Sequence, residues 1–202
     1  MKREATTARK NDDRTCKAET GRTRAEWFAR IEKVGATGRS AIGKFLLSEK
    51  VDAWWITTLT VDYEAAKGIV EKDGRPKGYS ICSTKTVGTP PARTFKALTT
   101  PADLAKWFGP GASIEAKEGA AIRDKDGVRG TMKKVKPYKA IVFTWDTPGF
   151  AEGSQVEVLV QPKGDKTGLV VNHTRVATRE DADAVRAAWE QALIRLKEHL
   201  EG

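Results

Sequence analysis

The sequence predicts an α+β fold in which a curved antiparallel sheet wraps around a long C-terminal helix, preceded by a small all-α domain. From residue 79 on, apolar and polar residues mostly alternate, which is the period of a strand, whereas before residue 71 apolar residues recur at helical spacing. The C-terminal run is amphipathic, with apolar residues every three or four positions. Consecutive strands followed by one helix favour a sheet whose apolar face packs on that helix.

The size and composition indicate a packed protein. The 202 residues suffice for one large domain or two small ones, and 39% of them are hydrophobic. The formal net charge of +9 is spread along the chain, with its densest cluster at Lys133, Lys134, Lys136 and Lys139. Lysines beside a turn more often face solvent than hold a phosphate backbone, so nucleic-acid binding through this cluster is the less favoured interpretation.

The two cysteines and the first residues of the chain indicate where in the cell the protein is found. Cys16 and Cys82 are too far apart to indicate a disulfide framework or metal-ligand spacing. The basic first residues resemble a signal peptide, but positions up to about 24 are polar and no apolar core follows. No apolar run of about 18 residues could cross a membrane. We therefore expect a cytoplasmic protein with no cofactor and no metal site.

Residues 23–70 are expected to form three short helices, centred on the apolar groups at residues 27–31, 42–46 and 54–63. Residues 1–20 carry few apolar positions and are expected to be frayed. The stretch EKDGRPKG at residues 71–78 has the composition of an exposed connector. We therefore place a helical module in residues 1–74 and a second domain in residues 75–202.

Four segments of the second domain are predicted as strands because they are rich in β-branched and aromatic residues: residues 79–87, 140–146, 154–161 and 168–176. Gly164-Asp165-Lys166 is expected to form a hairpin turn between the last two. Residues 114–117 and 128–135 are weaker strand candidates, separated by a turn at residues 124–127.

Two helices are expected in this domain. Thr100 would cap a short helix that begins at Pro101, carries Asp103 in its first turn and ends at Phe108. Thr178 would cap the terminal helix, which runs to about residue 200 and is roughly 33 Å long at 1.5 Å per residue. A strongly curved sheet around one helix cannot close at both ends, so a cavity is expected between them.

Four segments of this domain resemble homologues of the activator of the 90-kDa heat-shock-protein ATPase: TFKALTTPADLAKWFGPGA (residues 94–112), AIVFTW (140–145), GSQVEVLVQPKGDKTGLVVNHTRV (153–176) and AVRAAWEQALIRLKEHL (184–200). These homologues belong to the START-like, or SRPBCC, helix-grip superfamily. The resemblance implies a fold that binds hydrophobic or aromatic molecules and implies no shared catalytic residues.

Two parts of the chain limit what the resemblance implies. The stretch between Gly111 and Lys139 is shorter than the family's usual strand and hairpin, so the cavity could be small or open. Residues 16–69 more weakly resemble an uncharacterised bacterial helical module, and no function comes with that likeness.

The strand alternation and the two helices select eight candidate ligand-binding residues: Trp107, Phe108, Phe143, Trp145, Val158, Val171, His173 and Trp189. The alternative for each aromatic residue is that it only fills the core. His173 needs a polar partner on an apolar face, and we favour a hydrogen-bonded core histidine over ligand contact. Acid–base catalysis is the least favoured role, since no carboxylate or nucleophile is placed beside it by sequence.

Two features near the N-terminus have competing interpretations. Residues 38–44 have the G-x-x-x-x-G-K spacing of a phosphate loop, but Phe45 stands where serine or threonine should hold magnesium, and a helix rather than a strand precedes them. We therefore exclude nucleotide binding there.

Trp54 and Trp55 point about 100° apart on a helix, so both are buried only if that helix packs on two sides. We favour burial over an interface role for one of them.

The sequence therefore favours non-enzymatic binding of a small hydrophobic or aromatic ligand. The alternative is a co-chaperone or stress-related interaction protein that uses the outer sheet surface and the basic loop at residues 133–139. A third hypothesis is nucleic-acid binding by a helix-turn-helix at residues 40–47 and 51–67, although its second helix is poor in exposed basic residues. An enzyme stays open, because related folds host several chemistries. The expected partner is a small hydrophobic molecule, with a protein partner or homodimer as the alternative and no membrane.

Overall fold

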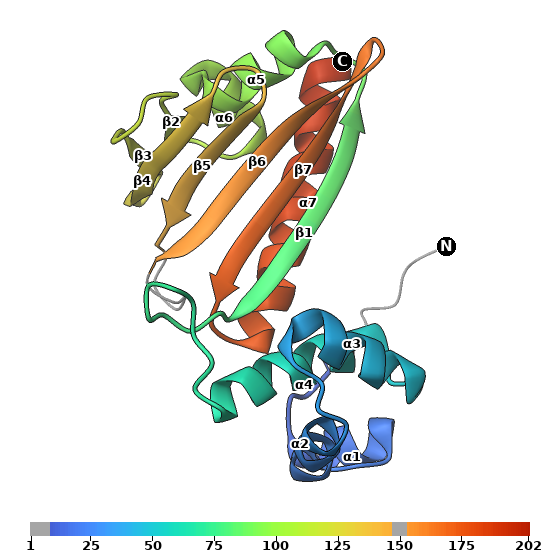
Figure 1. Cartoon of the computed structure of the whole chain (residues 1–202). Coiled ribbons are helices and arrows are strands. Elements are labelled where there is room, and N and C mark those ends of the chain that lie inside the picture. Colours follow the sequence, from blue (N-terminus) through green and yellow to red (C-terminus); the bar gives the residue numbers. More distant parts are fainter. Residues whose placement is uncertain (1–8, 147–152) are drawn as a thin grey trace. The chain divides into compact units, whose positions relative to one another are not determined.

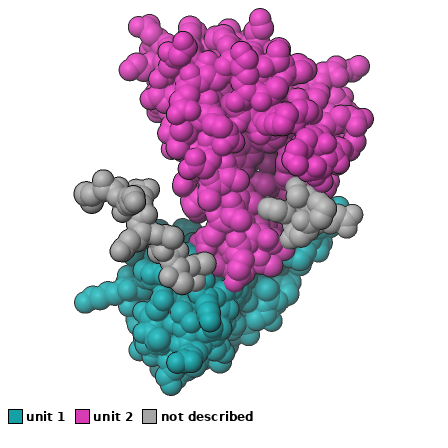
Figure 2. Space-filling view, turned by 180° about the vertical axis from the view of Figure 1, so that it is seen from behind, with its two compact units in different colours: residues 1–77 teal, residues 78–202 magenta. Residues whose placement is uncertain are grey.

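The computed structural model describes residues 9–146 and 153–202. The chain forms two compact units, residues 1–77 and 78–202 (Figure 2). None of the helices in the described residues is long and apolar enough to span a membrane.

The first unit contains four helices within its described residues (Figure 1): α1 (Asp13–Thr20), α2 (Arg24–Lys33), α3 (Gly38–Ser48) and α4 (Ala53–Ala66). The prediction of three helices after a frayed start is therefore wrong for residues 13–20, while residues 1–8 lie outside the described part. The side chain of Asp12 caps α1 by accepting a hydrogen bond of 2.7 Å from the Thr15 backbone N–H. Residues 38–45 lie within α3, so the phosphate-loop spacing belongs to a helix.

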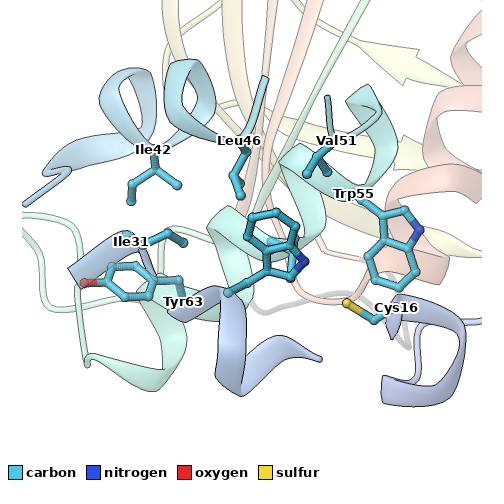
Figure 3. Packing of buried hydrophobic residues seen from close by; sticks show 9 residues of the cluster. Cys16, Ile31, Ile42, Leu46, Val51, Trp55 and Tyr63 are labelled. Carbon is cyan, nitrogen blue, oxygen red and sulfur yellow. The ribbon is translucent and has the colours of Figure 1, made fainter. Parts of the chain in front are cut away.

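A core of nine buried residues holds this unit together (Figure 3): Cys16, Trp27, Ile31, Ile42, Leu46, Val51, Trp55, Leu59 and Tyr63. The indole N–H of Trp27 donates to Thr20 Oγ1 over 2.8 Å, and that of Trp55 donates to Glu19 Oε2 over 2.7 Å. Helix α1 is thus held largely through polar groups, which explains why its apolar pattern did not reveal it. Trp55 is fully buried, but Trp54 is only partly buried, under the guanidinium of Arg9.

The second unit has the predicted α+β, helix-grip architecture. Seven strands in its described residues form one antiparallel sheet in the order β1-β7-β6-β5-β4-β3-β2. The strands are β1 (Tyr79–Val87), β2 (Ser113–Ile114), β3 (Ala121–Asp124), β4 (Gly127–Lys136), β5 (Ala140–Trp145), β6 (Ser154–Lys163) and β7 (Lys166–Val176). The predicted hairpin turn between β6 and β7 is confirmed.

Of the two weaker strand candidates, residues 128–135 are confirmed as β4, whereas residues 114–117 needed correction. The expected strand at residues 114–117 is reduced to Ser113–Ile114, and β3 was missed altogether. Only one large apolar side chain of β3, that of Ile122, is buried, so the segment carries almost no period-two signal.

Within the described residues of the second unit, three helices accompany the sheet: α5 (Pro91–Thr99), α6 (Pro101–Trp107) and α7 (Arg179–Glu201). The sequence predicted only the last two, because α5 begins at two prolines and has no side-chain cap. The predicted cap of α7 is confirmed: Thr178 Oγ1 accepts a hydrogen bond from the Asp181 backbone N–H. The predicted cap of α6 is wrong, since the Thr100 hydroxyl makes no such bond.

Helix α7 lies against one face of the sheet, behind β7 and β1 in the view of Figure 1. The residues it buries there lie on one stripe, as the amphipathic pattern predicted: Ala182, Val185, Trp189, Ala192, Leu193 and Leu196. The C-terminal end of this helix is also joined to α6, because His199 Nε2 lies 2.6 Å from Asp103 Oδ1. These contacts position the helix that forms one wall of the site described next.

Candidate ligand-binding site

A cavity of about 530 Å³ lies in the second unit, along α7. Its walls come from α7, the segment after α6, the β3–β4 turn and one residue each of β5 and β7: Phe108, Gly109, Pro110, Ala112, Asp124, Lys125, Trp145, His173, Ala184, Val185, Ala188, Trp189, Ala192 and Arg195. Ala184 and Ala188 are solvent-exposed, so the cavity is an open one.

The cavity exists because α7 presents small side chains to it. Ala184, Ala188 and Ala192 recur at four-residue spacing and therefore lie on one side of the helix. A methyl group at each of these positions leaves room that a leucine or phenylalanine would fill. The larger residues beside them, Val185 and Trp189, close the floor of the cavity against the sheet.

Aromatic side chains also line the cavity, and the ring of Phe108 packs against those of Trp145 and Trp189. The Phe108 ring centroid lies 5.5 Å from that of Trp145 at an interplanar angle of 89°, and 5.8 Å from that of Trp189 at 44°. Edge-to-face and tilted contacts of this kind are the favoured geometries between aromatic rings. Phe108 and Trp145 are only half-buried, so ring surface remains available to a molecule in the cavity.

His173 is held in one tautomer by its two neighbours. The indole N–H of Trp189, which can only donate, lies 3.2 Å from His173 Nδ1, so Nδ1 is the acceptor. The proton of the neutral ring is therefore on Nε2, which donates to Ser154 Oγ over 3.1 Å. The Ser154 hydroxyl donates in turn to the backbone carbonyl of Trp145. This chain of hydrogen bonds links α7, β7, β6 and β5 at the cavity wall.

Burial lowers the pKa of His173 to about 4, because the imidazolium form would lose its hydration. A protonated ring would also direct an Nδ1–H at the indole N–H of Trp189. His173 is therefore neutral at pH 7, and it contributes ring surface to the wall without a charge.

The charged side chains of the cavity lie at its rim. Burial acts to raise the pKa of Asp124, but hydrogen bonds from Arg129 and from backbone amides outweigh it and hold that pKa below its ordinary value. The Arg129 Nε–H donates to Asp124 Oδ2 over 2.7 Å. On the α7 side, the Arg195 Nε–H donates to the backbone carbonyl of Trp107 over 2.8 Å. The rim thus carries charge while the floor is apolar and aromatic.

The structure brings four of the eight candidate residues to the cavity: Phe108, Trp145, His173 and Trp189. The other four are buried and lie outside its lining: Trp107, Phe143, Val158 and Val171. The indole N–H of Trp107 points away, donating to the Ala97 carbonyl over 2.9 Å. Sequence reasoning did not select the alanines of α7 or Arg195, although alanine at every fourth position of an amphipathic helix is a readable signal.

The sequence of the second unit matches a known family. The family model of the Activator of Hsp90 ATPase homolog 1-like protein matches residues 88–201, which confirms the resemblance seen in the sequence. No curated protein matches the chain in sequence.

Several solved structures share the fold of the second unit. A Mesorhizobium loti protein is 20% identical with a TM-score of 0.53, over 61% of this chain and 97% of that one. CalU16 from Micromonospora echinospora is 24% identical with a TM-score of 0.54, over 60% and 76%. The Aha1 dimer from Colwellia psychrerythraea is 21% identical with a TM-score of 0.53, over 61% and 96%. At these identities the likeness shows the fold alone.

Proposed function

Since the chain belongs to the family of Activator of Hsp90 ATPase homolog 1-like proteins, and since its helix-grip unit leaves a cavity of about 530 Å³ along α7, we propose that it binds a small hydrophobic or aromatic molecule there without converting it. Small-molecule pockets typically measure about 300–1,000 Å³ and are lined mainly by apolar and aromatic side chains.

One observation carries the proposal: half-buried aromatic rings and a row of alanines line the same open cavity. Filling that space would remove the exposed surface of Phe108 and Trp145 from water. Each Å² of apolar surface buried contributes about 25 cal/mol, so a flat ring system placed there gains affinity without any new hydrogen bond.

The polar groups of the cavity favour binding over catalysis. His173 is neutral at pH 7, with one ring nitrogen accepting from Trp189 and the other donating to Ser154. The Asp124 carboxylate is engaged by Arg129. A general acid or base needs a proton-transfer atom that can reach the ligand and titrates near the working pH, and neither group meets both conditions.

Phenylnaphthylamine, an uncharged dye that fluoresces in apolar surroundings, tests the proposal. Its emission should rise on addition of the protein, and Ala188→Trp should weaken its binding about tenfold or more by filling the cavity. Ala187→Trp is the matched control, because Ala187 is also exposed on α7 but does not line the cavity. Failure of the dye to bind, or equal binding by both variants, would contradict the proposal.

A second proposal, an interaction protein, rests on the β4–β5 hairpin. Lys133, Lys134, Lys136 and Lys139 are exposed there, and none of them pairs with an acidic group among the described residues. Tyr138 is 57% exposed beside them, with its ring 5.5 Å from that of Phe95. An acidic surface of a chaperone would fit this patch. Recovery of such a partner from a lysate, abolished when the four lysines are changed to glutamate, would support it.

The remaining expectations stay predictions. The Colwellia relative was solved as a dimer, and we propose a homodimer as one form of protein partner, which light scattering of the purified protein tests. A cytoplasmic location remains a prediction from the sequence. Nucleic-acid binding by the first unit gains no support, because α4 contains no lysine or arginine.

A further inference from the structure

Arg195 lies at the rim of the cavity in a fixed orientation. Its Nε–H donates to the backbone carbonyl of Trp107, the last residue of α6, over 2.8 Å. This single bond directs the planar guanidinium while its terminal nitrogens stay available. No acidic side chain within residues 9–146 and 153–202 forms an ion pair with Arg195.

The other charges that line the cavity are matched. Asp124 receives a hydrogen bond from Arg129, and the Lys125 ammonium lies 3.3 Å from Asp126 Oδ1. Among the described lining residues, Arg195 is therefore the charge without an opposite partner. The rim carries an uncompensated positive charge next to an aromatic wall.

A guanidinium in this position has the properties of an anion receptor. It carries a positive charge, and its terminal nitrogens match the geometry of a carboxylate or sulfonate. Low-dielectric walls on one side strengthen its attraction for an anion relative to open water. The hydrogen bond to the Trp107 carbonyl at the end of α6 uses one of the five N–H donors of Arg195. A neutral glutamine could supply that single donor.

The distance along α7 between Trp189 and Arg195 limits the shape of a ligand that could contact both. Arg195 follows Trp189 by six positions, which corresponds to about 9 Å along the helix axis. A ring system packed on Phe108 and Trp189 would therefore place a substituent at its edge near the guanidinium.

Building on the proposed function, we infer that the ligand is an aromatic or polycyclic molecule with an acidic group, and that Arg195 receives this group at the α6 end of the cavity. The rings supply most of the buried apolar surface. The ion pair selects acids over neutral molecules of the same shape.

Two dyes that differ in one sulfonate group test this inference. Anilinonaphthalene sulfonate should bind the wild-type protein about tenfold more tightly than neutral phenylnaphthylamine. Arg195→Gln should abolish this preference while changing phenylnaphthylamine affinity less than about twofold, since glutamine keeps an N–H for the Trp107 carbonyl. Arg186→Gln is the matched control, because it removes the same charge from α7 away from the cavity lining.

The outcomes test the role of Arg195 separately from the binding of apolar molecules in the cavity. Equal affinity of the two dyes for the wild-type protein, or an equal loss for both dyes in Arg195→Gln, would overturn the role of Arg195 and leave the apolar cavity standing. Loss of the preference in Arg186→Gln to the same extent would also overturn it, since the effect would then follow overall charge. Binding of neither dye would contradict the proposed function itself. If Arg195→Gln fails to fold, Arg195→Lys, which keeps the charge, must retain a preference for the acid.

Discussion

The indole N–H of Trp189 donates to Nδ1 of His173 over 3.2 Å, which joins the middle of α7 to β7 at the cavity wall. Because an indole can only donate, this one contact fixes the tautomer of the imidazole and the direction of the two hydrogen bonds that follow it, through Ser154 to the Trp145 carbonyl. The same contact disfavours protonation of His173. His173, the residue that most resembles a catalytic group, thus joins helix α7 to the sheet.

The stability of the protein should fall in acid because of His173. Its pKa is about 4 in the folded state against an ordinary value of 6.5, so between these pH values the unfolded chain binds a proton that the folded protein does not. The free energy of unfolding should therefore decrease as the pH falls from 7 to 4, by about 3 kcal/mol at most from this group. Urea unfolding at several pH values measures it.

The chain has two histidines, so the control for this titration is simple. His173→Gln should remove most of the acid sensitivity that lies between pH 6.5 and 4, and the contribution of His173 should persist in His199→Gln, which leaves that ring in place. In an NMR titration, the ring signals of His173 should stay those of a neutral imidazole down to about pH 4. A midpoint near 6.5 for His173 would show that the ring is not desolvated as described.

Two buried serines of the sheet should respond in opposite ways to the same substitution. Ser154→Ala leaves the buried Nε2–H of His173 without its acceptor and should lower the free energy of unfolding by about 1–3 kcal/mol. Ser83 Oγ is also buried but has no hydrogen-bond partner among the described residues. Ser83→Ala removes a desolvated hydroxyl and should be neutral or stabilising. A larger loss for Ser83→Ala than for Ser154→Ala, measured by urea unfolding, would contradict this.

Much of the fold could be predicted from the sequence because its longer elements carry strong periodic signals. The strands β1, β5, β6 and β7 and the cap of α7 at Thr178 all followed from alternation and capping patterns. Helix α1 and strand β3 could not, because each buries one apolar residue and depends on contacts with distant parts of the chain. Local sequence does not record such contacts.

The candidate site was predictable only in part, for a geometric reason. Trp107 and Phe108 are adjacent on a helical turn and point about 100° apart, so only one of them can face the cavity. The sequence does not show which, and in the structure Trp107 is 2% exposed while Phe108 lines the cavity. Strand alternation identified the inner face of the sheet, but not the part of it that α7 leaves uncovered. A cavity forms where large side chains are absent, and sequence reasoning selected mainly large residues. The alanines of α7 were therefore not selected.

The two cysteines should report separately on the two units. Cys82, in the second unit, is exposed and should react at once with a thiol reagent. Cys16 is fully buried in the first unit, and burial raises the pKa of its thiol, so it should react only when that unit opens. Its labelling should accelerate in mild denaturant, and Cys82→Ala should leave that slow phase unchanged.

The two compact units predict that the second folds without the first. A fragment of residues 78–202 should remain folded and should bind phenylnaphthylamine with the affinity of the whole chain, because every residue that lines the cavity lies within it. An unfolded fragment, or one that has lost dye binding, would show that the second unit depends on the first.

The indole N–H signals of the six tryptophans test most directly whether a ligand occupies the cavity along α7. Trp145 and Trp189 line the cavity, whereas Trp27, Trp54 and Trp55 lie in the first unit. In nitrogen-15 NMR spectra, saturating phenylnaphthylamine should shift the signals of Trp145 and Trp189 and leave those of the first unit in place. Bound dye with unmoved signals of Trp145 and Trp189, or with shifts confined to the first unit, would contradict the account.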